Sequence, residues 1–242
     1  WKQLELDELP VVIDVPALGR TDSERRQLVA QTLDGLRQRR IVGQHGVDPD
    51  LADILGTLAR HRWAVEAWLL LERPVRALAA CRGEIGALAV LEGDRMRLAS
   101  CPPHSLLHEV IQLVRPAAGP GRSVTVRAEN LDAAARVAGR DMQRVAEELS
   151  RHGERADDAQ ALAQMCAQHN RLGQLGVLVR DRLGQQTPGR RVVGLHATPD
   201  GWYSQLRHTG HGGTFVTVTP ASPAVVLSQL RDLLDETRKL AG

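Results

Sequence analysis

The sequence predicts an α+β fold in which two related lobes share one antiparallel sheet. Short apolar runs separated by turn-forming residues indicate strands, and each group of four runs is followed by a helical pattern. The first group comprises residues 65–71, 77–80, 85–91, 95–99 and the helix 103–115. The second group repeats this order with residues 175–182, 191–198, 202–208, 213–219 and the helix 223–240. This repetition favours a scaffold that offers a surface over a fold built around one catalytic cleft.

The composition is that of an ordinary globular protein. A chain of 242 residues can bury a sizeable core, as one large domain or as two fused small ones. No apolar run approaches the length of a membrane span, so we expect no transmembrane helix. Cys81, Cys101 and Cys166 are widely spaced and form no CxxC motif, so we expect no disulfide framework and a cytoplasmic location.

The charge balance argues against a nucleic-acid binder. The chain has 31 basic and 29 acidic residues, a net charge of +2, and few aromatic residues that could stack on bases. Basic residues do gather in one predicted hairpin, at Arg180, Arg182, Arg190 and Arg191. This hairpin could contact an acidic partner or RNA phosphates, but a turn-rich, solvated loop is the favoured interpretation.

The N-terminal region predicts a short strand and two helices. Residues 11–15 form an apolar run that Pro16 and Gly19 close with a turn. Thr21 and Glu24 form a capping box at the start of the first helix. The stripe expected to be buried on that helix is Leu28, Val29, Leu33 and Leu36. Asp48 and Pro49 start the second helix, and its inward residues are Leu51, Ile54, Leu55 and Leu58.

Turn-forming residues and one linker predict the boundaries of the strands and lobes. Arg73-Pro74, Arg82-Gly83 and Gly93-Asp94 separate the first strands and predict an antiparallel meander. Residues 116–121 hold two prolines and two glycines, which predicts a linker. We therefore expect an N-terminal lobe at residues 1–119 and a C-terminal lobe at residues 120–242, joined in one continuous globular unit.

The second lobe begins with a predicted strand at residues 123–128 and a helix capped by Asn130. Residues 141–167 predict one or two more helices with a break near His152-Gly153. In the strand 213–219, alternation places Val216 and Val218 on one face and Thr217 on the other. We expect the two valines to face the closing helix.

No pattern of residues indicates catalysis. His104 and His108 stand at helical i, i+4 spacing, which can place two imidazoles on one metal ion, but no third ligand follows at a recognisable spacing. Two exposed helix histidines are the favoured interpretation. The chain has neither a G-x-S-x-G elbow nor a phosphate loop ending in GK[ST]. We expect no enzyme, metal or cofactor. The alternative is a small-molecule-binding protein or metal-dependent enzyme that uses a cleft between the lobes.

Several motifs, in this order, resemble a known family. They are Pro10-Val11-Val12, Leu18-Gly19-Arg20-Thr21, Asp48-Pro49-Asp50-Leu51-Ala52, and Pro120-Gly121-Arg122-Ser123-Val124. The C-terminal motifs are Leu175-Gly176-Val177-Leu178, Thr198-Pro199-Asp200-Gly201-Trp202-Tyr203 and Val216-Thr217-Val218-Thr219-Pro220-Ala221. In order and spacing they resemble the EspG proteins, cytosolic chaperones of ESX (type VII) secretion. The opening of this chain is shorter than the family usually shows.

The resemblance implies a central antiparallel sheet with helical bundles at either end and pseudo-twofold halves. It also implies a partner: EspG proteins bind PE–PPE heterodimers, cap the hydrophobic tip of the PPE helical hairpin, and direct substrates to the matching ESX system. Another helical-hairpin substrate of the same machinery could take that place. We expect a monomer or weak homodimer that binds neither nucleic acid nor membrane.

The resemblance implies that the contacts lie on the central sheet, one hairpin loop and the C-terminal helical bundle, and this suggests where the partner binds. The residues that we expect to contact it are Arg73, Pro74, Val177, Val179, Arg180, Val193, Leu195, Trp202 and Arg207. Trp202 and Tyr203 are adjacent on a strand and so point to opposite faces. Either one of them stands on an open face as an anchor, or each is buried under its own helical layer.

Overall fold

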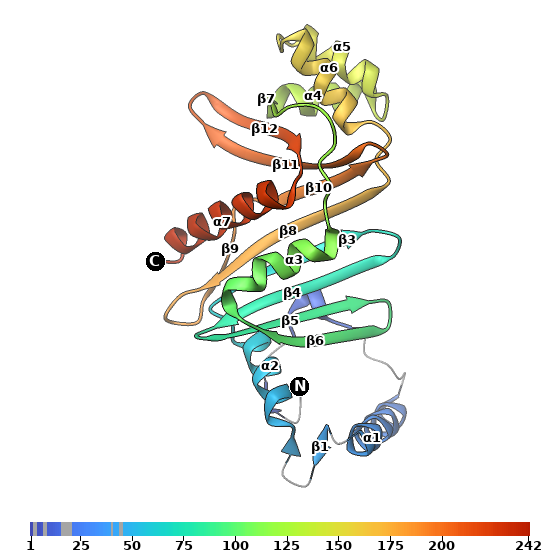
Figure 1. Ribbon diagram of the computed structural model, residues 1–242, viewed down its shortest axis with the longest axis vertical. Helices are drawn as coiled ribbons and strands as arrows, with labels where there is room; N and C mark the ends of the chain where they lie inside the picture. The colour runs from blue at the N-terminus through green and yellow to red at the C-terminus, as the bar shows by residue number, and fades with distance from the viewer. Residues whose placement is uncertain (2–3, 7–8, 16–20, 40, 44–45) are drawn as a thin grey trace.

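The chain folds around a large antiparallel sheet with helices on both faces (Figure 1). The computed structural model describes all residues except 2–3, 7–8, 16–20, 40 and 44–45. The helices are η2 (Val11–Ile13), α1 (Asp22–Gln38), α2 (Pro49–Ala59), η3 (Pro103–Ser105), α3 (Leu106–Val114), α4 (Ala128–Ala138), α5 (Met142–Arg151), α6 (Ala156–Cys166) and α7 (Pro223–Leu240). Among the described residues, no helix is both long and apolar enough to cross a bilayer.

The sheet consists of two meanders that meet at its centre. The strands are β3 (Trp63–Leu70), β4 (Pro74–Arg82), β5 (Ile85–Glu92), β6 (Arg95–Cys101), β7 (Val124–Arg127), β8 (Arg171–Arg180), β9 (Gln186–Pro188), β10 (Val193–Thr198), β11 (Gly201–Gly210) and β12 (Gly213–Pro220). Their order is β6-β5-β4-β3-β8-β10-β11-β12-β7, with β9 paired to β8. A separate small sheet pairs β1 (Val42–Gly43) with β2 (Gly46–Val47).

The central pair relates the two halves by a pseudo-twofold. β3 and β8 run antiparallel, with Trp63 opposite Val179 and Leu70 opposite Leu172. From this pair, β4 to β6 extend in one direction and β10 to β12 in the other, and each meander ends in a helix. The predicted α+β fold with a central antiparallel sheet is confirmed. The boundary between residues 119 and 120 stays a prediction.

One face of the sheet, here called the covered face, packs against α3 and α7. The buried stripe of α7 is Val226, Leu230, Leu233 and Leu234. It belongs to the same core as the odd-numbered residues of β8, such as Leu175 and Val177. Because α3 contributes to this core from the first half and α7 from the second, the core joins both meanders.

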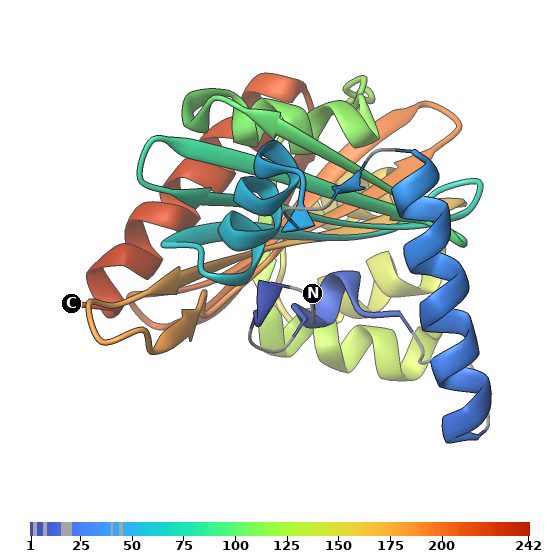
Figure 2. The ribbon, with the colours of Figure 1, turned by 90° about the horizontal axis from the view of Figure 1, so that it is seen from below.

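The opposite face, here called the open face, is covered by helices at its two ends (Figure 2). At one end, Leu58 of α2 and Ile13 of η2 pack in a core with Leu78 of β4. At the other end, the bundle of α4, α5 and α6 packs on β7, β11 and β12. Between these ends, Trp68 and Gln174 on the two central strands remain exposed.

Local sequence signals set several boundaries. Thr21 and Glu24 form the predicted capping box: each side chain accepts a hydrogen bond from the other's backbone amide, both at 3.2 Å. Asp48 caps α2 as predicted. Gly83 and Gly93 have φ values of +61° and +59° in the two-residue turns of the first meander. Glycine adopts this conformation without the steric cost of a Cβ atom.

The N-terminal predictions are partly wrong. Residues 11–15 do not form a strand: Val11–Ile13 is a short 3₁₀ helix, because burying Val12 and Ile13 against the sheet outweighs their strand preference. The inward stripe expected on α1 is also wrong, since none of its residues is buried and Val29 is 51% exposed. The turn predicted at Pro16 and Gly19 lies outside the described residues.

Two predictions in the second lobe also need correction. α4 begins at Ala128, before the predicted cap Asn130, whose side chain instead donates to the Glu154 carboxylate at 2.7 Å. Val216 and Val218 share a buried face as predicted, but they pack against α4, α5 and α6 rather than the closing helix α7. The alternation was predicted correctly, but the helices that cover each face depend on the path of the chain.

Candidate functional site

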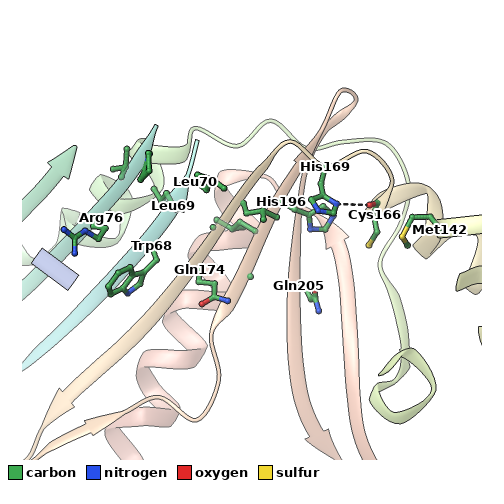
Figure 3. A pocket seen from close by; sticks show the side chains of 16 residues that line it. Trp68, Leu69, Leu70, Arg76, Met142, Cys166, His169, Gln174, His196 and Gln205 are labelled. Atoms are coloured by element: carbon green, nitrogen blue, oxygen red, sulfur yellow. Dashed lines mark hydrogen bonds between the residues drawn. The ribbon is translucent and has the colours of Figure 1, made fainter. Parts of the chain in front are cut away.

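The middle of the open face holds a groove of about 690 Å³. It runs from the β3–β4 turn to the ends of α5 and α6 (Figure 3). Apolar side chains and two glutamines dominate its lining: Trp68, Leu70, Met142, Leu172, Gln174 and Gln205. A concave, largely apolar surface with a few polar groups is typical of a binding site.

The floor of the groove is one row of residues across the sheet. Trp68 on β3 lies opposite Gln174 on β8, Gln174 lies opposite Gly194 on β10, and Gly194 lies opposite Gln205 on β11. Directly paired residues project from the same face of an antiparallel sheet. Because Gly194 has no side chain, the floor is low at its centre.

Exposed apolar side chains form one side of the groove. Leu70 and Leu172 lie opposite each other at the ends of β3 and β8, and they are 51% and 42% exposed. Trp68 is 41% exposed. Arg76 places its guanidinium 5.7 Å from the centre of the Trp68 ring and donates a hydrogen bond to the Asp14 carbonyl at 2.9 Å. These contacts hold Trp68 in place, so the apolar surface is preformed.

The other side of the groove is built on the end of α6. His196 of β10 donates from Nε2 to the Met165 carbonyl at 2.9 Å and stacks on Tyr203, with 5.5 Å between ring centres. His169 donates to the Cys166 carbonyl at 3.3 Å (Figure 3). The His196 bond ties the helical bundle to the sheet beside the groove, and the His169 bond lies within the segment that leads from α6 to β8.

Burial shifts the pKa of two groups on this side, His196 and Cys166, toward their uncharged forms. Burial lowers the pKa of His196 below its ordinary value, and the nearby His169 lowers it further, although the bond to Met165 opposes this. Burial raises the pKa of the Cys166 thiol to about 11. His196 and Cys166 are therefore compatible with an apolar ligand, because neither has to give up the hydration of a charge when a ligand covers this side of the groove.

Most of the residues predicted to contact a partner lie elsewhere. Five are buried in the core of the covered face, beneath α3 and α7, and their contact with a partner stays a prediction: Val177, Val179, Val193, Leu195 and Trp202. Of these, Leu195 also borders the groove. Trp202 and Tyr203 are each buried under a different helical layer. The predicted strands β8 and β10 do carry the groove, but through the alternate residues that face the other way.

The four remaining predicted residues are polar or at a turn. Pro74 lines the groove, and Arg73 precedes it in the exposed β3–β4 turn. Arg207 makes an ion pair of 2.8 Å with Asp132 of α4. Arg180 lies at the other end of β8 from the groove, where its Nη1 is 3.5 Å from the Gly184 carbonyl.

Four residues of the groove were not predicted from the sequence: Trp68, Leu70, Leu172 and Gln174. A usable signal was present: polar residues and glycines interrupt the apolar strands at alternate positions, at Glu66, Gln174 and Gly194. Such positions mark the face of a buried strand that no helix covers.

The two histidines that the sequence offered as metal ligands lie on the surface. His104 in η3 and His108 in α3 are both exposed. In the part of the chain that the structure describes, no three His, Cys, Asp or Glu side chains lie close enough together to hold a metal ion.

Comparisons with known proteins give a consistent result. The model of the EspG family matches residues 1–232. Among solved structures, the chain is similar to the Mycobacterium tuberculosis type VII secretion system chaperone EspG5, in complex with a PE25–PPE41 dimer. The sequence identity is 19%, the TM-score is 0.71, and the match covers 86% of this chain and 85% of that chain. This similarity concerns the fold. No curated protein sequence matches the chain.

Proposed function

This chain belongs to the EspG family, and from that premise we propose that it is a chaperone of type VII secretion whose groove binds the substrate. The proposed partner is a PE–PPE heterodimer or a related helical-hairpin substrate, which docks its apolar tip on the open face. In the cytoplasm the chaperone keeps this tip from aggregating and directs the substrate to its ESX system. No catalytic step is involved.

The observation that carries this proposal is the preformed apolar surface of the groove. Trp68, Leu70 and Leu172 are exposed side by side in the middle of a sheet whose ends are both covered. Exposed apolar patches of this kind mark protein interaction sites. The β3–β4 turn, with Arg73 and Pro74, borders the groove. We expect these two residues to contact the edge of the bound substrate, as predicted from the sequence.

Trp68 supplies the largest expected contribution to binding. An aromatic side chain buries about 150–250 Å². With Trp68 41% exposed in the free protein, docking hides about 60–100 Å², worth about 1.5–2.5 kcal/mol. Trp68→Ala should therefore raise Kd about 10- to 70-fold.

Co-expression with the PE–PPE pairs of the same genome, followed by affinity purification and titration of the complex, tests the proposal. Gly194→Leu should block the groove without unfolding the protein, because a Cβ atom at Gly194 meets its nearest neighbour, the Gln205 carbonyl oxygen, at 3.4 Å. Met96→Ala is the matched control, since Met96 is 39% exposed on the edge strand β6.

The proposal requires that Trp68→Ala and Gly194→Leu weaken binding while Met96→Ala does not. If no PE–PPE pair forms a stable complex with the unmodified protein, the chaperone function is wrong. If the complex forms but tolerates both groove substitutions, the substrate binds another surface.

A further inference from the structure

Glu66 is a half-buried carboxylate next to the groove on the open face. It projects from the same side of β3 as Trp68, because the two residues are two positions apart. Its cross-strand neighbours, Leu78 on β4 and Gly176 on β8, carry no charge. Among the described residues, none donates a hydrogen bond to Glu66 or forms an ion pair with it. Burial raises the pKa of Glu66, and no opposing interaction compensates for its lost hydration.

Two cations of the open face, Arg76 and Arg180, are directed elsewhere. Arg76 lies beside Trp68 on β4, where it donates to the Asp14 carbonyl and stacks on the indole ring. Arg180 is four residues beyond Gly176 on β8, about 13 Å along the strand. It lines a different, smaller pocket near the end of α7.

The space beside Glu66 is open to an incoming group. A Cβ atom built on Gly176 would have a single neighbour within 4 Å, Val192 Cγ1 at 3.7 Å. Val192 itself is 41% exposed. This sparse packing over Gly176 leaves room for a side chain to approach the carboxylate from the groove.

We propose that Glu66 determines the specificity of the groove by forming a salt bridge with a Lys or Arg that the substrate carries beside its apolar tip. This inference rests on the proposed function, because the substrate must cover the open face. Docking removes the remaining water from Glu66, and a buried carboxylate without a cation is strongly unfavourable. A tip that brings a cation over Gly176 is accepted, whereas one that brings an apolar or acidic residue there is rejected.

The same carboxylate lowers the stability of the free protein at neutral pH. Its folded-state pKa is raised above the ordinary 4.5, so the folded state takes up the proton more readily than the unfolded state. Stability therefore falls as pH rises through this range. Glu66→Gln should raise the Tm of the free protein at pH 7, and the gain should disappear toward pH 4. A purely structural role for Glu66 predicts the opposite change at pH 7.

The test compares binding of one PE–PPE heterodimer, chosen because it binds the unmodified protein, to Glu66→Gln and Glu66→Lys. Glu84→Gln, in the exposed β4–β5 turn, is the control. Losing a charged hydrogen bond should raise Kd about 10-fold or more for Glu66→Gln and leave Glu84→Gln unchanged. Replacing the basic residues near the substrate tip by Glu, one at a time, should identify one variant that binds Glu66→Lys better than it binds the unmodified protein.

The outcomes separate this inference from the proposed function. Equal or tighter binding by Glu66→Gln, while the unmodified protein binds its substrate, overturns the role of Glu66 alone. Failure of every charge-reversed substrate to prefer Glu66→Lys also overturns it. If the unmodified protein binds no PE–PPE pair, the proposed function and the role of Glu66 are both overturned.

Discussion

Replacing Val218 with Asp tests which helical layer covers β12. Val218 is 1% exposed in the core under α4, α5 and α6, whereas the adjacent Thr217 points to the other face and is half-buried. The Thr217 and Thr125 hydroxyls form a hydrogen bond of 2.8 Å across β12 and β7. We expect Val218→Asp to be severely destabilising and Thr217→Asp to be mild.

The magnitude follows from what each change buries. Losing the buried valine costs about 1.5 kcal/mol or more. Keeping an Asp with an ordinary pKa of about 3.9 protonated at pH 7 costs about 3 pKa units, or about 4 kcal/mol. The total of about 6 kcal/mol is comparable to the whole stability of a typical domain. Thr217→Asp loses one exposed hydrogen bond, worth about 1 kcal/mol.

Urea denaturation at pH 7 and pH 4 measures both effects, with Val218→Ala as the control for lost packing. The folded-state pKa of the new Asp is raised, so the variant gains stability as pH falls. The difference between Val218→Asp and Val218→Ala should therefore shrink by up to about 4 kcal/mol at pH 4. The reasoning is refuted if Thr217→Asp is the more damaging change, or if the difference does not depend on pH.

Two further predictions concern Cys166 and α1. Maleimide labelling of Cys166, followed by mass spectrometry, should keep accelerating up to pH 11, because burial holds the thiol pKa at about 11; a plateau near pH 9 contradicts this. Bound substrate should slow the labelling, since Cys166 lines the groove. Thr21→Ala should speed proteolysis within α1 by removing its capping box, but leave the Tm unchanged because α1 buries no residue; a clear fall in Tm contradicts this.

The strands and closing helix could be predicted from local patterns. Gly83 and Gly93 punctuate the first meander, and Pro223 begins α7 at its predicted position. These signals depend on residues within a few positions of one another, so they are visible in the sequence alone.

The face that we propose for binding could not be predicted in the same way. Val177 and Leu178 on β8 are both buried, because one faces α7 and the other faces the core around α2. Apolar alternation therefore identifies two faces without showing where a helix stops covering one of them. That coverage depends on the packing of α2 against one end of the open face and of the α4–α6 bundle against the other. The residues predicted from the sequence consequently lie on the strands that carry the groove, but most of their side chains belong to the core of the covered face.

The central pairing of β3 with β8 also constrains when the chaperone becomes functional. β3 and β8 pair residues that lie more than 100 positions apart, from Leu70 opposite Leu172 to Trp63 opposite Val179. At a synthesis rate of about 5–20 residues per second, β3 remains an unpaired edge strand for at least about 5–20 seconds. During that interval the nascent first meander exposes a sheet edge open to wrong pairing. Because the groove floor spans both meanders, the proposed substrate site is complete only when β8 and β10 have been synthesised and have joined the sheet.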